Sequence, residues 1–225
     1  MTDPVPFADL ALAAYCPRKC YYRRRDARET PPVQDRARDL AGRYPTLLVA
    51  SDAALASLDL AVPPAAFRRA LSRTRDRLDA WSSIVDPPER DVFLSGRTAR
   101  GRVQKVLYDP LAPVLVSPGE PPETGVWTPQ SVRATAAAAA LAWREQRSVE
   151  VAFVEYPRHG VIRRITVSGR RRGEFRRALD AVRALDGPPP RLHDDAKCGA
   201  CEYADQCGVQ TRSLRSLLAP GGETD

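Results

Sequence analysis

The chain has 225 residues, of which 43% are hydrophobic and 7% aromatic, a composition typical of a globular protein with a buried core. No apolar run is long enough to cross a bilayer, and the first residues lack the basic and apolar regions of a signal peptide, so we expect a cytoplasmic protein without membrane contact. The formal net charge is +7 and nearly all cations are arginine, which favours a polyanionic partner, although the interspersed acids fit a plain solvated surface equally well.

The first third of the chain is predicted to be helical. Helical spacing of the apolar residues predicts a helix over 7–14, a basic turn over 18–25, a mostly polar helix over 33–44 and a short helix over 51–58. A longer helix begins at the Pro63–Pro64 pair. Its apolar residues share one face, which indicates a packing role: Phe67, Leu71, Leu78 and Trp81.

After the prolines at 87 and 88 the apolar period changes to two, which is typical of strands. Strands are expected over 91–95, 102–108, 113–117, 149–156 and 160–167. Helices are expected over 129–145, where a run of alanines allows close approach to a sheet, and over 171–185. We therefore predict an α/β fold, with a central mixed sheet of about five strands flanked by helices, in a single domain over 1–218. The end of the chain is expected to form an amphipathic helix over 210–218 and a disordered tail over 219–225.

The five cysteines lie near the two ends of the chain. Two stand in the run YCPRKC at 15–20, and three follow the pattern C-x2-C-x5-C at 198–207. In a reducing compartment this spacing favours metal binding over disulfides. A tetrahedral site on three thiolates lacks a fourth ligand, which the other end of the chain can supply. We therefore expect a metal clasp that joins 16–20 to 198–207.

The Tyr-Cys-Pro-Arg run and the three-cysteine pattern together resemble one family over nearly the whole chain: the CRISPR-associated RecB-like exonucleases (the Cas-four group) of the PD-(D/E)xK nuclease superfamily. The resemblance implies a restriction-endonuclease-like core, a role in antiviral defense or DNA repair, and a [4Fe-4S] cluster held by Cys16, Cys198, Cys201 and Cys207. It leaves Cys20 as a spare thiol or, one helical turn after Cys16, as an alternative ligand. Zn is the alternative metal because four thiolates suit both, and a metal-free alternative treats the cysteines as small buried hydrophobes.

The positions that this family uses for catalysis carry other residues here. The resemblance implies an Asp on one strand and an acid-x-Lys on the next, which hold a divalent ion and orient the attacking water. The aligned positions are Gln104, Leu115 and Ser117, and no histidine precedes them. We therefore expect a lost or impaired hydrolytic site. If the enzyme is active, the displaced acids Asp91 and Glu155 are the candidate ligands for Mg or Mn.

Seven residues are candidates for nucleic-acid binding. The arginines are expected to bind the backbone, and the last two residues to line the former active-site cleft: Arg18, Arg23, Arg24, Arg100, Arg102, Gln130 and Arg133. The alternative is that these residues only cap or solvate helices. Strand alternation turns Lys105 away from the face used by Gln104.

The sequence thus predicts an iron-sulfur protein that binds DNA, single-stranded or at DNA ends, and whose hydrolytic site is lost or impaired. A first alternative is an active metal-dependent DNA exonuclease that works with CRISPR adaptation or repair proteins. A second alternative is a non-catalytic structural subunit that binds a protein partner and whose basic face is incidental.

Overall fold

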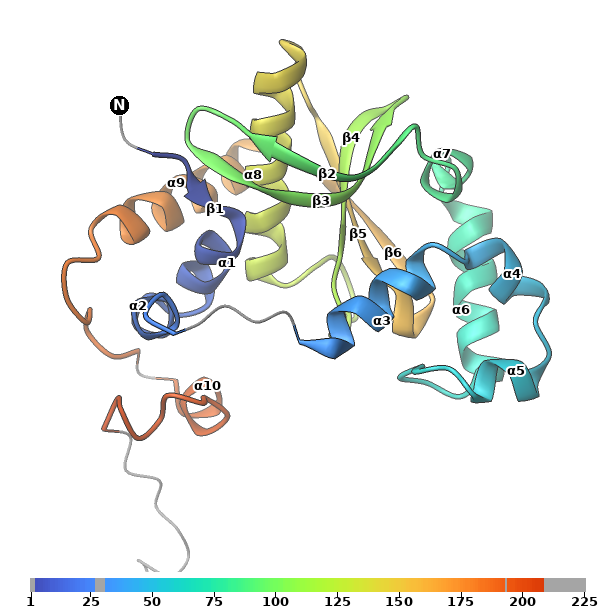
Figure 1. Cartoon of the computed structure of the whole chain (residues 1–225), viewed down its shortest axis with the longest axis horizontal. Coiled ribbons are helices and arrows are strands. Elements are labelled where there is room, and N and C mark those ends of the chain that lie inside the picture. The colour runs from blue at the N-terminus through green and yellow to red at the C-terminus, as the bar shows by residue number, and fades with distance from the viewer. Residues whose placement is uncertain (1–2, 27–30, 193, 209–225) are drawn as a thin grey trace, which may run out of the picture.

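The computed structural model describes residues 3–26, 31–192 and 194–208, in which helices flank one mixed sheet of six strands (Figure 1). The strands are β1 (Val5–Pro6), β2 (Glu89–Ser95), β3 (Ala99–Tyr108), β4 (Leu111–Val116), β5 (Val151–Tyr156) and β6 (Val161–Thr166). The predicted α/β class is confirmed. The sequence prediction of about five strands missed β1, because two residues are too few to show an alternating pattern.

Strand β3 organises the pairing of the sheet. Strand β2 runs antiparallel along one edge of β3, from Glu89 opposite Val106 to Ser95 opposite Arg100. Strand β1 pairs parallel with the first residues of β3, and β4 pairs antiparallel with its last residues, from Lys105 onward. Beyond β4, β5 is parallel to β4 and β6 is antiparallel to β5. The sheet is therefore mixed, and β3 and β4 are no longer paired at Gln104.

The helices largely follow the predicted ranges. They are α1 (Phe7–Tyr15), α2 (Pro17–Arg23), α3 (Pro32–Ala41), α4 (Tyr44–Val49), α5 (Asp52–Ala56), α6 (Pro64–Arg77), α7 (Trp81–Val85), α8 (Thr128–Glu145), α9 (Gly169–Arg183) and α10 (Asp195–Gly199), with a 3-10 turn, η1, at Pro157–His159. Trp81 begins α7 instead of extending α6. The helix and tail expected over 210–225 lie outside the described residues. Within the described ranges, no helix is both long and apolar enough to cross a membrane.

Two apolar cores cover the two faces of the sheet. Helices α1, α8 and α9 pack on one face, where the buried alanines of α8 approach the sheet closely. Helices α3, α4, α6 and α7 pack on the other face, around residues such as Phe67, Leu71 and Phe153. In Figure 1, α10 and the segment that follows it lie beside α2, away from α4 to α6. The segment after the start of α10 carries the C-terminal cysteines.

The contact between β3 and α1 leaves no room for a side chain at Gly101. A Cβ at this position would lie 2.5 Å from the Phe7 ring, whereas a Cβ at Gly169 would meet nothing within 4 Å. We predict that Gly101→Val lowers the free energy of unfolding by about 1–3 kcal/mol, because overpacking forces the Phe7 ring or the backbone to move. Urea denaturation measures this loss.

The control for this substitution is Gly169→Ala, in the first turn of α9. No atom lies near that position, so the change should leave the free energy of unfolding unaltered or raise it by about 0.4–1 kcal/mol. The rise would come from the unfolded chain, in which Ala has less conformational freedom than Gly. Equal destabilisation by the two variants would contradict the proposed packing of β3 on α1.

Candidate functional site

Four of the five cysteines line one small cavity. Cys16 is the N-cap residue of α2, and its Sγ accepts a hydrogen bond from the Lys19 backbone N–H at 3.4 Å. Cys198, Cys201 and Cys207 come from α10 and the turns after it. All four thiols line a cavity of about 20 Å³. The four residues that the resemblance assigned to a metal centre thus lie together.

Contacts between the two chain ends hold these cysteines near one another. The Arg18 guanidinium donates to the Pro189 carbonyl oxygen at 3.0 Å. The Tyr22 hydroxyl donates to the Gln206 carbonyl oxygen at 3.1 Å, and the Tyr22 ring stacks on the Tyr203 ring with centroids 5.6 Å apart. These groups are 171 and 184 residues apart along the chain. These side-chain contacts join the two chain ends beside the four cysteines, and the name clasp is used below for this region.

Cys20 does not belong to this cavity. Its side chain is fully buried in the core beneath α1, and its Sγ donates to the Asp9 carbonyl oxygen at 3.4 Å. The expectation that Cys20 can replace Cys16 as a ligand is therefore wrong. Cys16 stands before the first turn of α2 and Cys20 lies inside the helix, so the spacing of one turn does not give the two thiols a common direction.

The donor set suits a thiophilic metal, although the sulfurs do not yet converge on one point. Four thiolates are the usual ligands of structural zinc and of iron-sulfur clusters. Among the described residues, no three His, Cys, Asp or Glu side chains are close enough to hold a metal ion. The fit to a metal centre therefore rests on the chemistry of the four thiols that line the cavity.

The positions aligned with the family's catalytic acids lie at and beside the point where β3 and β4 separate: Gln104, Leu115 and Ser117. Gln104 lies where β3 and β4 separate, and its Oε1 accepts the backbone N–H of Val116 at 2.8 Å. This amide therefore replaces the ladder hydrogen bond that is lost at the junction. Leu115 is buried in the core beside α8, and Ser117 is buried just after β4. None of these three side chains carries the charge that a divalent cation needs.

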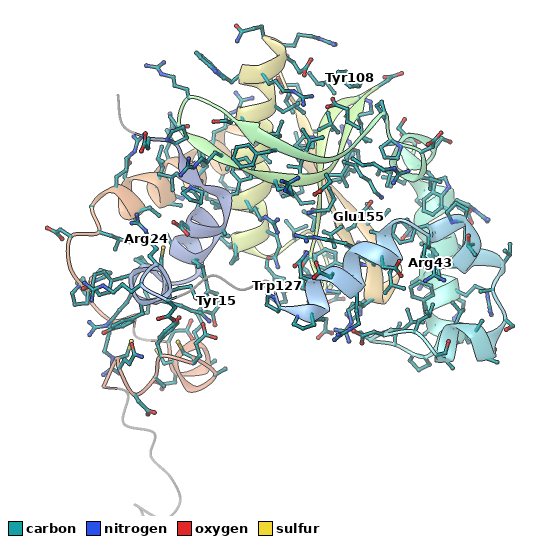
Figure 2. All side chains as sticks on the ribbon, viewed as in Figure 1. Tyr15, Arg24, Arg43, Tyr108, Trp127 and Glu155 are labelled. Carbon is teal, nitrogen blue, oxygen red and sulfur yellow. The ribbon has the colours of Figure 1, made fainter. Side chains whose placement is uncertain are left out.

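A buried ion pair lies on the face of the sheet that α3 covers. The Lys105 Nζ is 2.6 Å from Glu155 Oε1 and also donates to the Ala41 carbonyl oxygen at 3.0 Å. The two side chains are 3% and 0% exposed, and Figure 2 shows Glu155 inside the molecule near α3. Burial raises the pKa of Glu155, and Lys105 opposes that rise. Burial, with the nearby Glu155 carboxylate, also raises the pKa of the Tyr44 hydroxyl.

The displaced acids considered for catalysis do not converge. Glu155 is fully buried against Lys105, so it does not share the cleft with Gln104, contrary to the sequence expectation. Asp91 is exposed on β2 with a φ of 53°, and its carboxylate lies 3.1 Å from Arg102. Because β3 and β4 lie between the strands of these two acids, they cannot bind one metal ion together.

A second cavity, of about 190 Å³, lies between the end of β4 and the start of α8. It is lined by Leu115, Ser117, Gln130 and Arg133, four of the residues singled out from the sequence. Gln130 Nε2 donates to Ser117 Oγ at 3.4 Å. Burial, together with repulsion by Arg38, lowers the pKa of Arg133 to about 10. Because the described lining carries a cation and no carboxylate, it suits an anion and not a divalent metal ion.

The predicted backbone-binding arginines differ in availability. Three of them contact residues elsewhere in the chain: Arg18 the Pro189 carbonyl oxygen, Arg24 the Asp9 carboxylate at 3.5 Å and Arg102 the Asp91 carboxylate. Arg23 is half-buried and pairs with Asp26 at 4.0 Å, whereas Arg100 is exposed. Nearby, Arg25 is exposed and its guanidinium lies 4.1 Å from the Tyr21 ring centroid. Arg23 and Arg25 lie beside the clasp, so they are the cations to test against a ligand there.

Sequence reasoning missed the partnership of Lys105 with Glu155. The available signal was the lysine itself, one of only three in the chain, on a strand whose other charged side chains are arginines. Its partner was not evident, because the pair depends on β3 and β5 lying on either side of β4.

Comparison with known proteins does not assign the chain to a family. No family model matches the sequence, and no curated protein is significantly similar to it. The functional interpretation therefore depends on the chain's own cysteines, arginines and missing carboxylates.

The buried pair yields a prediction about stability and pH. Lys105→Met should cost about 3–5 kcal/mol of unfolding free energy at neutral pH, because Glu155 stays buried without its cation. Without the lysine, burial raises the Glu155 pKa further above its ordinary value of 4.5. A raised pKa means that the folded state binds the proton more tightly, so stability is lost as the pH rises through that range. The loss of unfolding free energy in Lys105→Met should therefore become smaller as the pH is lowered toward 4.5.

Urea denaturation of both proteins across this pH range measures the effect. The double variant Lys105→Met with Glu155→Leu removes both charges and should recover most of the loss, with no comparable pH dependence. A Lys105→Met deficit that is the same at every pH would show that Glu155 does not carry the effect.

Proposed function

We propose that the protein is an iron-sulfur, nuclease-like protein that binds DNA without hydrolysing it. The observation that carries this proposal is the single cavity lined by Cys16 and the three C-terminal cysteines. The fold supports it, because a meander of β2 to β4 is followed by α8 and the β5–β6 pair, the order that the resemblance implied. A restriction-endonuclease-like core and a role beside CRISPR adaptation or repair proteins remain part of the proposal.

The missing hydrolytic site follows from the chemistry of the positions where the acids are expected. Gln104 holds the junction of β3 and β4, and the neighbouring cavity presents Arg133 instead of carboxylates. A cation in this place repels Mg²⁺ and attracts phosphate. This arrangement favours binding of a DNA backbone over its cleavage.

The identity of the metal is a separate question. We assign a [4Fe-4S] cluster on the strength of the family resemblance, with zinc as the alternative. The present cavity of about 20 Å³ has space for roughly one water-sized species, so a cluster needs a larger movement of the turns at 200–208 than zinc does.

We predict that protein purified without oxygen contains iron and sulfide, shows visible charge-transfer absorption, and loses both metal and colour in Cys201→Ala. The reason is that three thiolates hold a centre less well than four, and metal bound only by the folded state contributes to its stability. Elemental analysis, sulfide determination and absorption spectra provide the measurement. The Cys201→Ala variant should also unfold at a lower temperature than the parent protein.

Cys20→Ala is the matched control, because it removes a cysteine that does not line the cavity. It should keep the full metal content. A colourless protein with stoichiometric zinc would overturn the cluster assignment, and a metal-free native protein, or equal metal loss in both variants, would overturn the centre itself.

We also predict salt-sensitive binding of single-stranded DNA near the clasp. Arg23→Glu with Arg25→Glu should weaken binding and reduce the slope of log K against log salt by about 1.4, which corresponds to two lost phosphate contacts. Arg24 is left intact because its contact with the buried Asp9 is structural. Fluorescence anisotropy with a labelled oligonucleotide at several salt concentrations measures the effect.

The charge-matched control is Arg43→Glu with Arg75→Glu, two exposed arginines paired with Asp39 and Asp76 far from the clasp. This control should keep most of the affinity. Affinity that does not depend on salt would favour a protein partner instead. Nucleotide release with Mg or Mn that Asp91→Ala abolishes would show that the protein is an active exonuclease.

A further inference from the structure

A cavity lies far from the cysteines, between the last turns of α8, the first turns of α9 and the β2–β3 turn. It is a half-open hollow of about 620 Å³. Figure 1 shows these three elements meeting on the side of α8 that faces away from α6. A volume of this size falls in the range of about 300–1000 Å³ that small-molecule sites occupy.

The floor of the hollow is apolar and rigid. It is formed by the alanines of α8, with Ala139 exposed and Trp143 one turn further along the same face. The β2–β3 turn forms one wall, and it contacts α8 so closely that a Cβ on Gly96 would lie 2.7 Å from the Ala140 Cα. Trp143 is 53% exposed, although it borders this apolar surface. An open indole one turn from the exposed Ala139 methyl group is a suitable surface for an aromatic ring.

Four arginines surround this floor. Arg97 comes from the β2–β3 turn, Arg147 follows α8, and Arg172 and Arg176 lie one turn apart on α9. All four are exposed, and among the described residues the ion pair recorded for them joins Arg172 to Glu150 at 3.8 Å. The hollow therefore carries about three unbalanced positive charges next to an apolar surface.

The position of Arg172 also conflicts with the local preference of a helix. Helix α9 begins Gly-Arg-Arg-Arg and has no acid in its first turn. Cations at a helix N-terminus interact unfavourably with the helix dipole. Each of these arginines has a partner within the chain: Arg170 pairs with Glu174, Arg171 with Ser131 and Arg172 with Glu150. Arg172 also lines the hollow, where its charge is available to a ligand.

We propose that this hollow binds a nucleotide, with the base on the Trp143 and alanine floor and the phosphates on the surrounding arginines. Base stacking on an aromatic side chain and forked contacts from arginine to phosphate are the two interactions that such a ligand needs. The nucleotide is either free or the terminal unit of a DNA strand, since both present the same chemistry. This site goes beyond the DNA binding proposed for Arg23 and Arg25, because it uses other residues.

Calorimetric titration of the full chain tests the site, with ATP, dTTP and a 5′-phosphorylated ten-residue oligo-dT as separate probes. Trp143→Ala should weaken binding about tenfold, as the loss of one stacking contact implies. Arg147→Glu with Arg176→Glu should weaken it at least as much. Tighter binding of the triphosphates indicates a free nucleotide and tighter binding of the oligonucleotide indicates a strand end; both outcomes support the site.

Trp127→Ala is the matched control, because Trp127 is a 52% exposed tryptophan at the other end of α8 (Figure 2). It should bind all three probes as the parent protein does, and thermal melts of each variant show whether the chain is folded. The site is disproved if Trp143→Ala binds normally, if both tryptophan variants lose equal affinity, if no probe binds the folded parent protein, or if poly-glutamate binds as tightly as the nucleotides. The Arg23 and Arg25 variant should keep its affinity for ATP, so the two proposals fail independently.

Discussion

The close packing of α8 on the sheet is the constraint on which the rest of the structure depends. The helix approaches so closely because its inner face is alanine, and Gly96 meets it without a side chain. Helix α1 packs against the same helix and leads into the segment that carries Cys16. A rigid α8 therefore fixes three regions at once: the Arg133 cavity at its first turns, the arginine-surrounded hollow at its last turns and, through α1, the N-terminal half of the clasp.

The Lys105–Glu155 pair brings an acid and a lysine together in the interior, where neither side chain can reach a substrate. A catalytic pair must contact water, substrate or a metal ion. Here both side chains are buried, and the lysine donates a second hydrogen bond to the Ala41 carbonyl oxygen at the end of α3. Because an uncompensated buried charge is costly, any arrangement that separated the two side chains would be destabilised.

The sequence predicted most of the fold because its signals were local. Alternating apolar residues marked five strands, and Pro64 and Pro129 marked the beginnings of two long helices, α6 and α8. The shortest strand was missed because it pairs with β3 through long-range contacts that leave no local pattern. The four cysteines that the family resemblance assigned to one centre do line one cavity. The direction of Cys20, the burial of Glu155 and the hollow around Trp143 depend on tertiary packing, so no spacing rule could supply them.

The clasp also sets an order of events during synthesis. Tyr22 and Gln206, which touch in the folded protein, are separated by 184 residues of chain. At typical ribosomal rates of about 5–20 residues per second, roughly 10–40 s pass between the synthesis of the two halves of the clasp. The sheet and both apolar cores can form in that interval, whereas a centre that needs all four thiolates has to wait for the last one. In the metal centre proposed above, insertion therefore follows the synthesis of Cys207 and the folding of the sheet.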